Sequence, residues 1–150
     1  MYHLEERIEK IIKVLKELSI RGRRAVENVE ICPCGYKTGN IPPAAGWRAF
    51  SVNDVWGSGK DGHAWFRFDI NVPADWQGKA VALSVATACT GWDEFNPQLL
   101  CYVDGRMRQG MDANHRTVRI EAGKDRHIAL YAYTGYESYI FKGLPDVVRQ

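Results

Sequence analysis

The sequence has no long apolar run and no marked excess of charge of one sign, and each absence excludes a class of protein. None of its apolar runs approaches the roughly 20 residues that a membrane-spanning helix needs, and the chain starts with a charged helical pattern rather than a signal peptide. Lysine and arginine total 20 against 18 aspartate and glutamate, a net charge of +2, which gives no support to a nucleic-acid binder. We therefore expect a cytoplasmic protein whose partners include neither a membrane nor a nucleic acid.

Cysteine is scarce and does not have the spacing of a metal site. Of four cysteines, Cys32 and Cys34 form a CPC tripeptide, whereas Cys89 and Cys101 lie in apolar stretches, and the four histidines are scattered. A structural zinc site favours CxxC-like pairs or paired histidines. We expect free or buried thiols in a reducing compartment, with no metal and no cofactor bound by this chain.

The chain also lacks the local motifs of common catalytic and nucleotide sites: a GxSxG elbow, HExxH, and the glycine-rich loops GxxxxGKS and GxGxxG. Asp93 and Glu94 could suggest the paired carboxylates of a glycosidase. Neighbouring residues on a strand or loop commonly point apart, however, whereas the two glycosidase carboxyl groups must converge on one bond. Neither these local motifs nor the Asp93–Glu94 pair therefore points to a catalytic residue.

What is present begins with a helical pattern, in a chain of single-domain length. From Leu4 to Leu18 apolar residues recur at steps of three and four, with glutamates and lysines on the other face, which predicts an amphipathic helix of about 18 residues within 1–22. A coiled-coil dimer is one interpretation, but a stripe this short more often packs on its own or a neighbouring domain. Glycine and proline in 23–46 predict a connecting segment, with a short strand or turn over 25–31.

Residues 47–150 carry alternating apolar residues separated by turn signals. In HAWFRFDINV the alternate residues from Ala64 to Val72 are apolar, which predicts a half-buried strand. Trp65 is the exception on the opposite face and is predicted to lie under a neighbouring element or in an interface. Seven or so such strands, with no helical pattern among them, predict a mostly β domain, an antiparallel β-sandwich of jelly-roll type over 47–150.

A hairpin that ends in a polar loop is the most distinctive local pattern. An apolar run is followed by Asp104 and Gly105, a pair that favours a type I′ turn. The return strand leads into a loop that holds Asp112, Asn114 and His115. A histidine beside a carboxylate could act in acid–base work or bind a polyol. Alternatively, these side chains could cap the backbone of their own loop.

Several stretches together resemble the N-terminal domain of the glycoside hydrolase family 38 α-mannosidases, of the cytosolic and vacuolar branch. They are YHLEERIEKI, DVWG, WFRFDINVPADWQGK, TGWDEFNPQLLCYVDG and RQGMDANHRTV, and they span nearly the whole chain. The resemblance implies a galactose-binding-like sandwich in a parent enzyme that is a zinc-dependent, retaining hydrolase of terminal α-D-mannosides. The family's catalytic and zinc-binding residues match no positions here, so the resemblance implies a non-catalytic accessory domain, with the catalytic domain and its zinc further along the parent.

Two functions are open for such a domain. It could pack on the parent's catalytic domain or at a subunit interface, including that of a homo-oligomer, through the helix stripe and exposed aromatics such as Trp65, Tyr131 and Tyr133. It could instead be a carbohydrate-binding module that uses loop aromatics and polar side chains. The candidate sugar or interdomain contacts are Trp56, Trp65, Trp92, Asp93, Asp112, Asn114 and His115.

Overall fold

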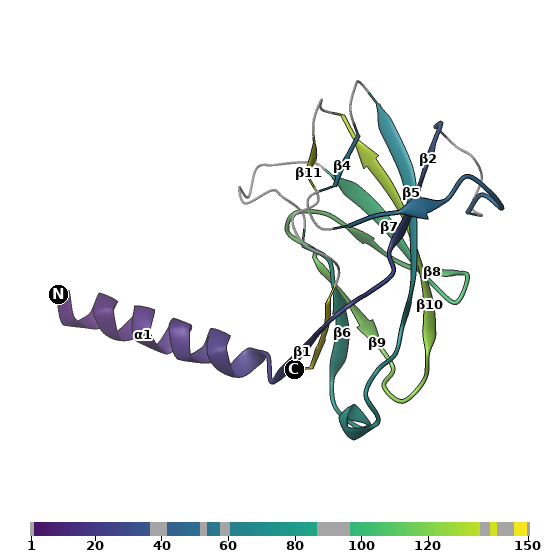
Figure 1. Cartoon of the computed structure of the whole chain (residues 1–150). Coiled ribbons are helices and arrows are strands. Elements are labelled where there is room, and N and C mark those ends of the chain that lie inside the picture. The colour runs from purple at the N-terminus through teal and green to yellow at the C-terminus, as the bar shows by residue number, and fades with distance from the viewer. Residues whose placement is uncertain are drawn as a thin grey trace.

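The computed structural model describes residues 2–36, 42–51, 54–57, 61–86, 97–135, 139–140 and 146–149. One helix, α1 (Tyr2–Ser19), precedes two layers of β-strands and projects away from them (Figure 1). The last strand ends beside the base of this helix, so the two ends of the sandwich lie at one corner (Figure 1).

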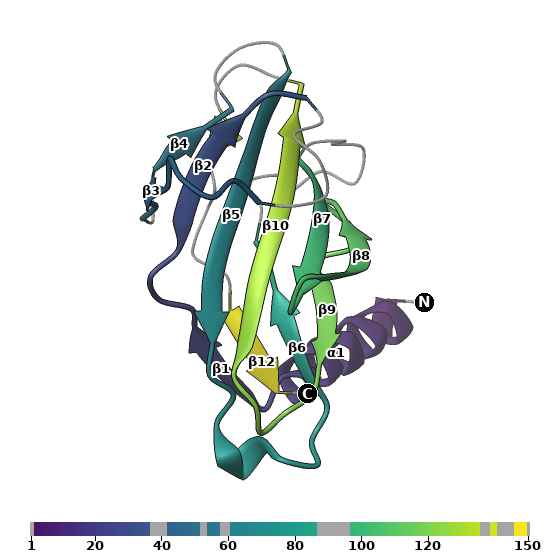
Figure 2. The same ribbon diagram turned by 90° about the vertical axis from the view of Figure 1, so that its right-hand side faces the viewer.

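The two layers are antiparallel sheets, which confirms the predicted mostly β sandwich (Figure 2). The larger sheet has the order β3 (Arg48–Ala49), β2 (Glu30–Cys34), β5 (Gly62–Ile70), β10 (Arg126–Thr134), β7 (Gln98–Val103) and β8 (Arg106–Met111). The smaller sheet has the order β1 (Gly22–Ala25), β12 (Asp146–Arg149), β6 (Val81–Ser84) and β9 (Thr117–Ile120). A two-stranded ribbon joins β4 (Val55–Trp56) to β11 (Tyr139–Ile140), and a short 3₁₀ helix, η1 (Ala74–Trp76), follows β5.

The core lies between the sheets and is built by the alternation that the sequence predicts. On β5 the inward residues are apolar and almost fully buried, and β10 contributes a second inward row that includes Ile128 and Leu130. Val81 and Leu83 of β6 and Val147 of β12 close the core from the smaller sheet. Because side chains alternate along a strand, the remaining residues of β5 and β10 point to the outer face of the larger sheet.

That outer face carries a second apolar cluster of its own. Trp65 has an exposed fraction of 0% and packs with Cys32, Tyr102 and Ala129. The aromatic ring centroids of Tyr102 and Tyr131 lie 5.4 and 5.2 Å from that of Trp65. Trp65 therefore lies under neighbouring side chains, which confirms the prediction that it is covered by another element. The expectation that Trp65 is an exposed docking residue is wrong.

The sandwich begins earlier than the sequence suggests. The predicted connecting segment 23–46 contains most of β1 and all of β2, so its glycines and prolines do not prevent regular structure. Pro33 is tolerated inside β2 because β3 pairs only with Glu30 and Ile31, which leaves Pro33 on an edge that needs no further donor. The predicted boundary at residue 47 is therefore wrong, and the sandwich starts at Gly22.

The predicted hairpin is confirmed between β7 and β8. Asp104 and Gly105 have φ values of 51° and 75°, the left-handed conformation that both central residues of a type I′ turn require. The Asp104 carboxylate accepts hydrogen bonds from Arg126, at 2.7 Å, and from the backbone N–H of His127, at 3.0 Å. These bonds hold the pKa of Asp104 below its usual value and fasten the turn to β10.

The predicted amphipathic helix is also confirmed, with 18 residues in α1. Every helix residue whose side chain is described, His3 to Ser19, is exposed to solvent, including the whole apolar stripe. Across the described ranges, no helix is long and apolar enough to cross a membrane.

Candidate functional site

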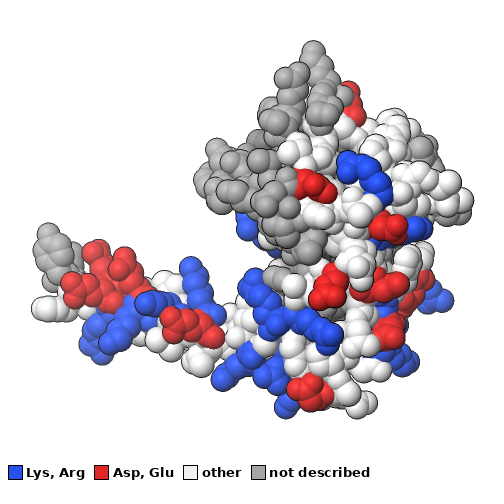
Figure 3. All heavy atoms as spheres, in the orientation of Figure 1, with Lys and Arg blue, Asp and Glu red and all other residues white. Residues whose placement is uncertain are grey.

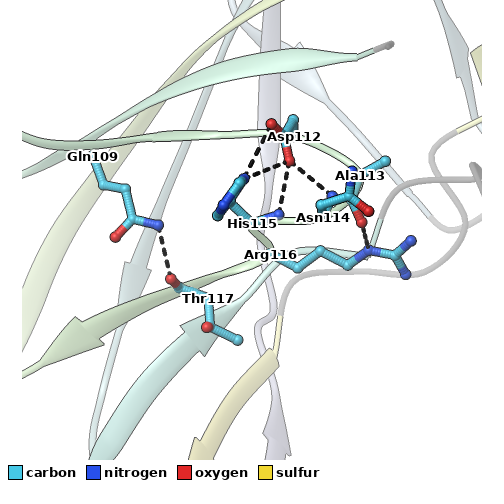
Figure 4. A network of polar contacts seen from close by, with 7 residues as sticks. All are labelled: Gln109, Asp112, Ala113, Asn114, His115, Arg116 and Thr117. Carbon is cyan, nitrogen blue, oxygen red and sulfur yellow. Dashed lines mark hydrogen bonds and ion pairs between the residues drawn. The ribbon is translucent and has the colours of Figure 1, made fainter. Parts of the chain in front are cut away.

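The polar loop after β8 is held by one carboxylate (Figure 4). Oδ1 of Asp112 accepts the backbone N–H of Asn114 at 2.8 Å and that of His115 at 2.7 Å. The same oxygen lies 3.0 Å from Nδ1 of the His115 ring, and the second carboxylate oxygen lies 3.2 Å from it. Both oxygens of Asp112 are thus engaged by their own loop, which favours the self-capping interpretation over an acid–base role.

The loop's electrostatics follow from these contacts. The N–H groups of His115 and Asn114, and then the His115 ring, stabilise the charged carboxylate and lower the pKa of Asp112. The next turn is tied down by Arg116, whose Nε donates to the carbonyl of Ala113, and by Gln109, which donates to the carbonyl of Thr117 at 3.0 Å (Figure 4). The loop therefore presents a rigid, ionised edge.

Asp112 also borders a groove of about 460 Å³ on the outer face of the larger sheet, which we call the tyrosine groove. Strand register explains how it forms, because Tyr131 of β10 lies opposite Leu100 of β7, which lies opposite Gly110 of β8. Tyr131, Leu100 and Gly110 thus form one row across the three strands. A Cβ atom on Gly110 would meet only a backbone oxygen, at 4.0 Å, so there is open space at the Gly110 end of this row. The groove is lined by Gln98, Leu99, Leu100, Gly110, Met111, Asp112, Tyr131 and Tyr133.

Both groove tyrosines are oriented by hydrogen bonds at their hydroxyl groups. The hydroxyl of Tyr131 lies 2.8 Å from Nδ1 of His63, a buried histidine on β5. The hydroxyl of Tyr133 donates to Asp61 at 3.2 Å, which raises the pKa of Tyr133. With their polar ends held, the rings present apolar faces to the groove, where they can pack on an apolar side chain or on the C–H face of a sugar.

The structure brings few of the predicted contact residues together. Trp56 is a buried core residue, 5.3 Å from Phe66 between ring centroids, so neither Trp56 nor Trp65 is available as a surface contact. Both predictions fail for the same reason. Each side chain is buried in an apolar cluster that the local alternation of residues did not reveal. Trp92 and Asp93 lie outside the described residues. Asp112 reaches the tyrosine groove, Asn114 and His115 do not line it, and the functional roles of all three stay predictions.

Sequence reasoning missed two groups that shape this site. Gly110 was not among the predicted site residues, yet it is a strand residue whose missing side chain opens the groove. His63 and Asp61 were not considered as partners of the tyrosines, because the pairing of Tyr133 with His63 depends on a register between distant strands. Tyr131 and Tyr133, which were predicted as exposed aromatics, do lie on the outer face of the larger sheet, where both are half-buried.

Comparison with known proteins agrees with the fold. The family model described as the jelly roll domain of alpha-mannosidase matches residues 35–137, about two thirds of the chain, including all of the strands that build the tyrosine groove. No curated protein matches the chain significantly. The match contains five strands of the larger sheet, all but β2, and β6 and β9 of the smaller sheet, and it agrees with the antiparallel two-layer architecture. The chain therefore belongs to the family of α-mannosidase jelly roll domains.

Proposed function

We propose that this chain is a non-catalytic accessory domain of an α-mannosidase, and that its tyrosine groove docks on the catalytic domain or at a subunit interface of the parent enzyme. The observation that carries the proposal is the row of Tyr131, Leu100 and Gly110 across three rigid strands. Leu100 is exposed and the tyrosines are half-buried, which suits the aromatic and aliphatic core of a protein–protein interface.

The parent enzyme is proposed to be a zinc-dependent, retaining glycoside hydrolase of family 38 that acts on terminal α-D-mannosides. Within the described ranges, no three His, Cys, Asp or Glu side chains lie close enough to hold a metal ion. The zinc chemistry is therefore assigned to another part of the parent, and no step of it is routed through the residues described here. The free thiols of Cys32 and Cys101 support a cytoplasmic location.

Filling the groove in the parent enzyme tests the docking proposal. Gly110→Leu places a side chain in open space without a positive φ, so the domain should fold normally while its docking surface is blocked. Thr117→Leu, at an exposed position of the smaller sheet, is the matched control. We expect Gly110→Leu alone to loosen the domain, seen as faster hydrogen exchange of β10 in the full-length enzyme. Equal exchange of β10 in the isolated domain and in the wild-type enzyme would contradict docking.

Carbohydrate binding at the same groove is the second candidate, and one observation favours it. The groove combines two aromatic faces with the Asp112 carboxylate and the Gln98 amide, and its volume falls within the roughly 300–1,000 Å³ range of small-ligand sites. Titration of the chain with mannose and mannobiose by NMR separates the candidates. Shifts confined to groove residues and abolished by Gly110→Leu would favour sugar binding, whereas no shifts at millimolar sugar would favour docking.

A further inference from the structure

A second groove, of about 460 Å³, lies where the edge strands of the two sheets meet. β8 is an edge strand of the larger sheet and β9 is an edge strand of the smaller one, and the two lie side by side (Figure 2). The side-chain amide of Gln109 on β8 joins them by donating to the carbonyl of Thr117 on β9 at 3.0 Å. We call this the arginine groove, and it is lined by Val103, Arg108, Arg119, Ile120, Glu121 and Arg126.

A β-bulge places Arg108 in this groove. Met107 of β8 lies opposite Tyr102 of β7. The next pair joins Gln109 to Cys101, so Arg108 is the extra residue of the bulge. Because Tyr102 belongs to the outer cluster and Cys101 to the core, the strand turns over between these two pairs. A bulge re-aims the side chains of its strand, and here both Arg108 and Gln109 reach toward β9.

The three arginines of the groove differ in how their charges are balanced. The Arg126 side chain is 15% exposed and donates to Asp104 at 2.7 Å and to Glu121 at 2.6 Å. Arg108 and Arg119 are exposed, and the side chain of neither forms a hydrogen bond or an ion pair with any residue that the structure describes. Two guanidinium groups therefore line one groove with their charges unpaired, next to a third that two carboxylates already hold.

Phosphate is the anion whose chemistry matches this pair of side chains. A single guanidinium fork can occupy both oxygens of a carboxylate. A phosphate monoester carries a charge of about −1.5 to −2 and three strong acceptor oxygens, so one phosphate can pair with both forks at once. The volume of the groove falls within the roughly 300–1,000 Å³ range of small-ligand sites, which leaves room for the group that carries the phosphate.

The surrounding surface favours a small anion over a polyanion. On the face shown in Figure 3, lysine and arginine side chains are interspersed with aspartate and glutamate over the sandwich. Within the groove itself, Glu121 adds a carboxylate beside the arginines. A nucleic acid needs a continuous basic patch for its successive phosphates, whereas one phosphate needs only one pair of guanidinium groups.

We propose that the arginine groove binds a phosphate group, free or as the monoester of a small molecule, between Arg108 of β8 and Arg119 of β9. The two side chains come from different sheets, so a bound phosphate links the sheets at this edge and raises the unfolding temperature of the domain. The groove shares no lining residue with the tyrosine groove, so binding here is independent of the docking function proposed above.

Titration of the chain with glucose 6-phosphate, followed by NMR at constant ionic strength, tests the proposal. We expect saturable shifts at millimolar ligand in the amides of β8 and β9, and none with glucose. Arg108→Gln with Arg119→Gln should raise Kd at least about tenfold, because two charge-assisted partners are lost. The absence of saturable shifts with glucose 6-phosphate, or shifts that survive both substitutions, would overturn the proposal. Inorganic phosphate, titrated in parallel, identifies the source, since equal affinity supports free phosphate and weaker affinity supports a monoester.

Two further double variants show whether binding needs the guanidinium forks of this groove. Arg24→Gln with Arg48→Gln makes the same charge change at exposed positions of β1 and β3, the strands at the opposite edges of the two sheets. This control should leave Kd nearly unchanged, and a loss equal to that of the groove variant would mean diffuse charge attraction instead of a site. Arg108→Lys with Arg119→Lys keeps both charges without the forks and should still weaken binding several-fold, whereas wild-type affinity would contradict pairing by the forks. Circular dichroism checks the fold of every variant.

Discussion

Replacing Trp65 by alanine should destabilise the sandwich less than the same change at Phe66, although tryptophan is the larger side chain. Both have an exposed fraction of 0%. Removing a buried Phe or Trp ring costs roughly 3–5 kcal/mol through lost burial and the cavity left behind. The indole N–H of Trp65, however, is buried without a hydrogen-bond partner in the described structure, and removing such an orphaned donor returns about 1–3 kcal/mol.

The net expectation is a loss of about 2 kcal/mol for Trp65→Ala against about 4 kcal/mol for Phe66→Ala. Trp65→Phe keeps a ring and removes the orphaned N–H, so it should lie within about 1 kcal/mol of the wild type. Urea unfolding followed by circular dichroism measures all three, and equal m-values would show that the unfolded states are comparable. In a domain of this size each kcal/mol lowers Tm by about 2–4 °C, so the two alanine variants should differ clearly.

Two results would refute this reasoning. A loss at Trp65→Ala equal to or greater than that at Phe66→Ala would mean that the indole N–H is satisfied in solution, for example by a bound water. A loss well below about 1 kcal/mol would mean that the outer cluster does not act as a second core. In the second case the tyrosine groove would lack a firm base, because Tyr131 packs directly on Trp65.

Three further predictions concern the hairpin, a thiol and the polar loop. Gly105→Ala should lower stability by about 1–2 kcal/mol in thermal unfolding, because φ is 75° there, whereas Gly105→Asn should cost less. Burial raises the pKa of Cys101 to about 12, so iodoacetamide at pH 8 should leave it unlabelled by mass spectrometry until the chain unfolds, and early labelling would contradict its burial. The lowered pKa of Asp112 stabilises the fold above the carboxyl's unfolded pKa, and this contribution is lost as pH falls through the folded pKa. Asp112→Ala should therefore reduce the urea midpoint near neutral pH but not in strong acid, and a pH-independent difference would argue against this origin.

Local periodicity was enough to predict the elements whose formation depends only on residues close together in the sequence. The helix needed only the spacing of its apolar stripe, and β5 needed only its alternation from Ala64 onward. The hairpin followed from Asp104 and Gly105, because few residue pairs accept positive φ at both central positions. In each case the physical cause acts over a few neighbouring residues.

The features that depend on distant pairing could not be predicted in this way. In the sequence Pro33 is expected to break a strand, and only the structure shows that β3 ends before it reaches Pro33. Trp65 resembles a surface aromatic in the sequence, and only the structure shows that Tyr102 and Tyr131 lie beside it. The tyrosine groove needs Tyr131, Leu100 and Gly110 in one row, and that register joins three strands whose contact is set by the whole fold.

The pairing of the first strand with the last gives the sandwich a mechanical weak direction. Gly22 and Arg149 are partners at the open ends of β1 and β12, and the N–H of Arg21 donates to the carbonyl of Arg149 at 2.7 Å. A pulling force applied between α1 and residue 149 would load these hydrogen bonds one after another, like a zipper, rather than all together in shear. A pull on α1 would deliver tension to this corner, where β1 should separate from β12 at low force while the nine-residue pairing of β5 with β10 stays intact.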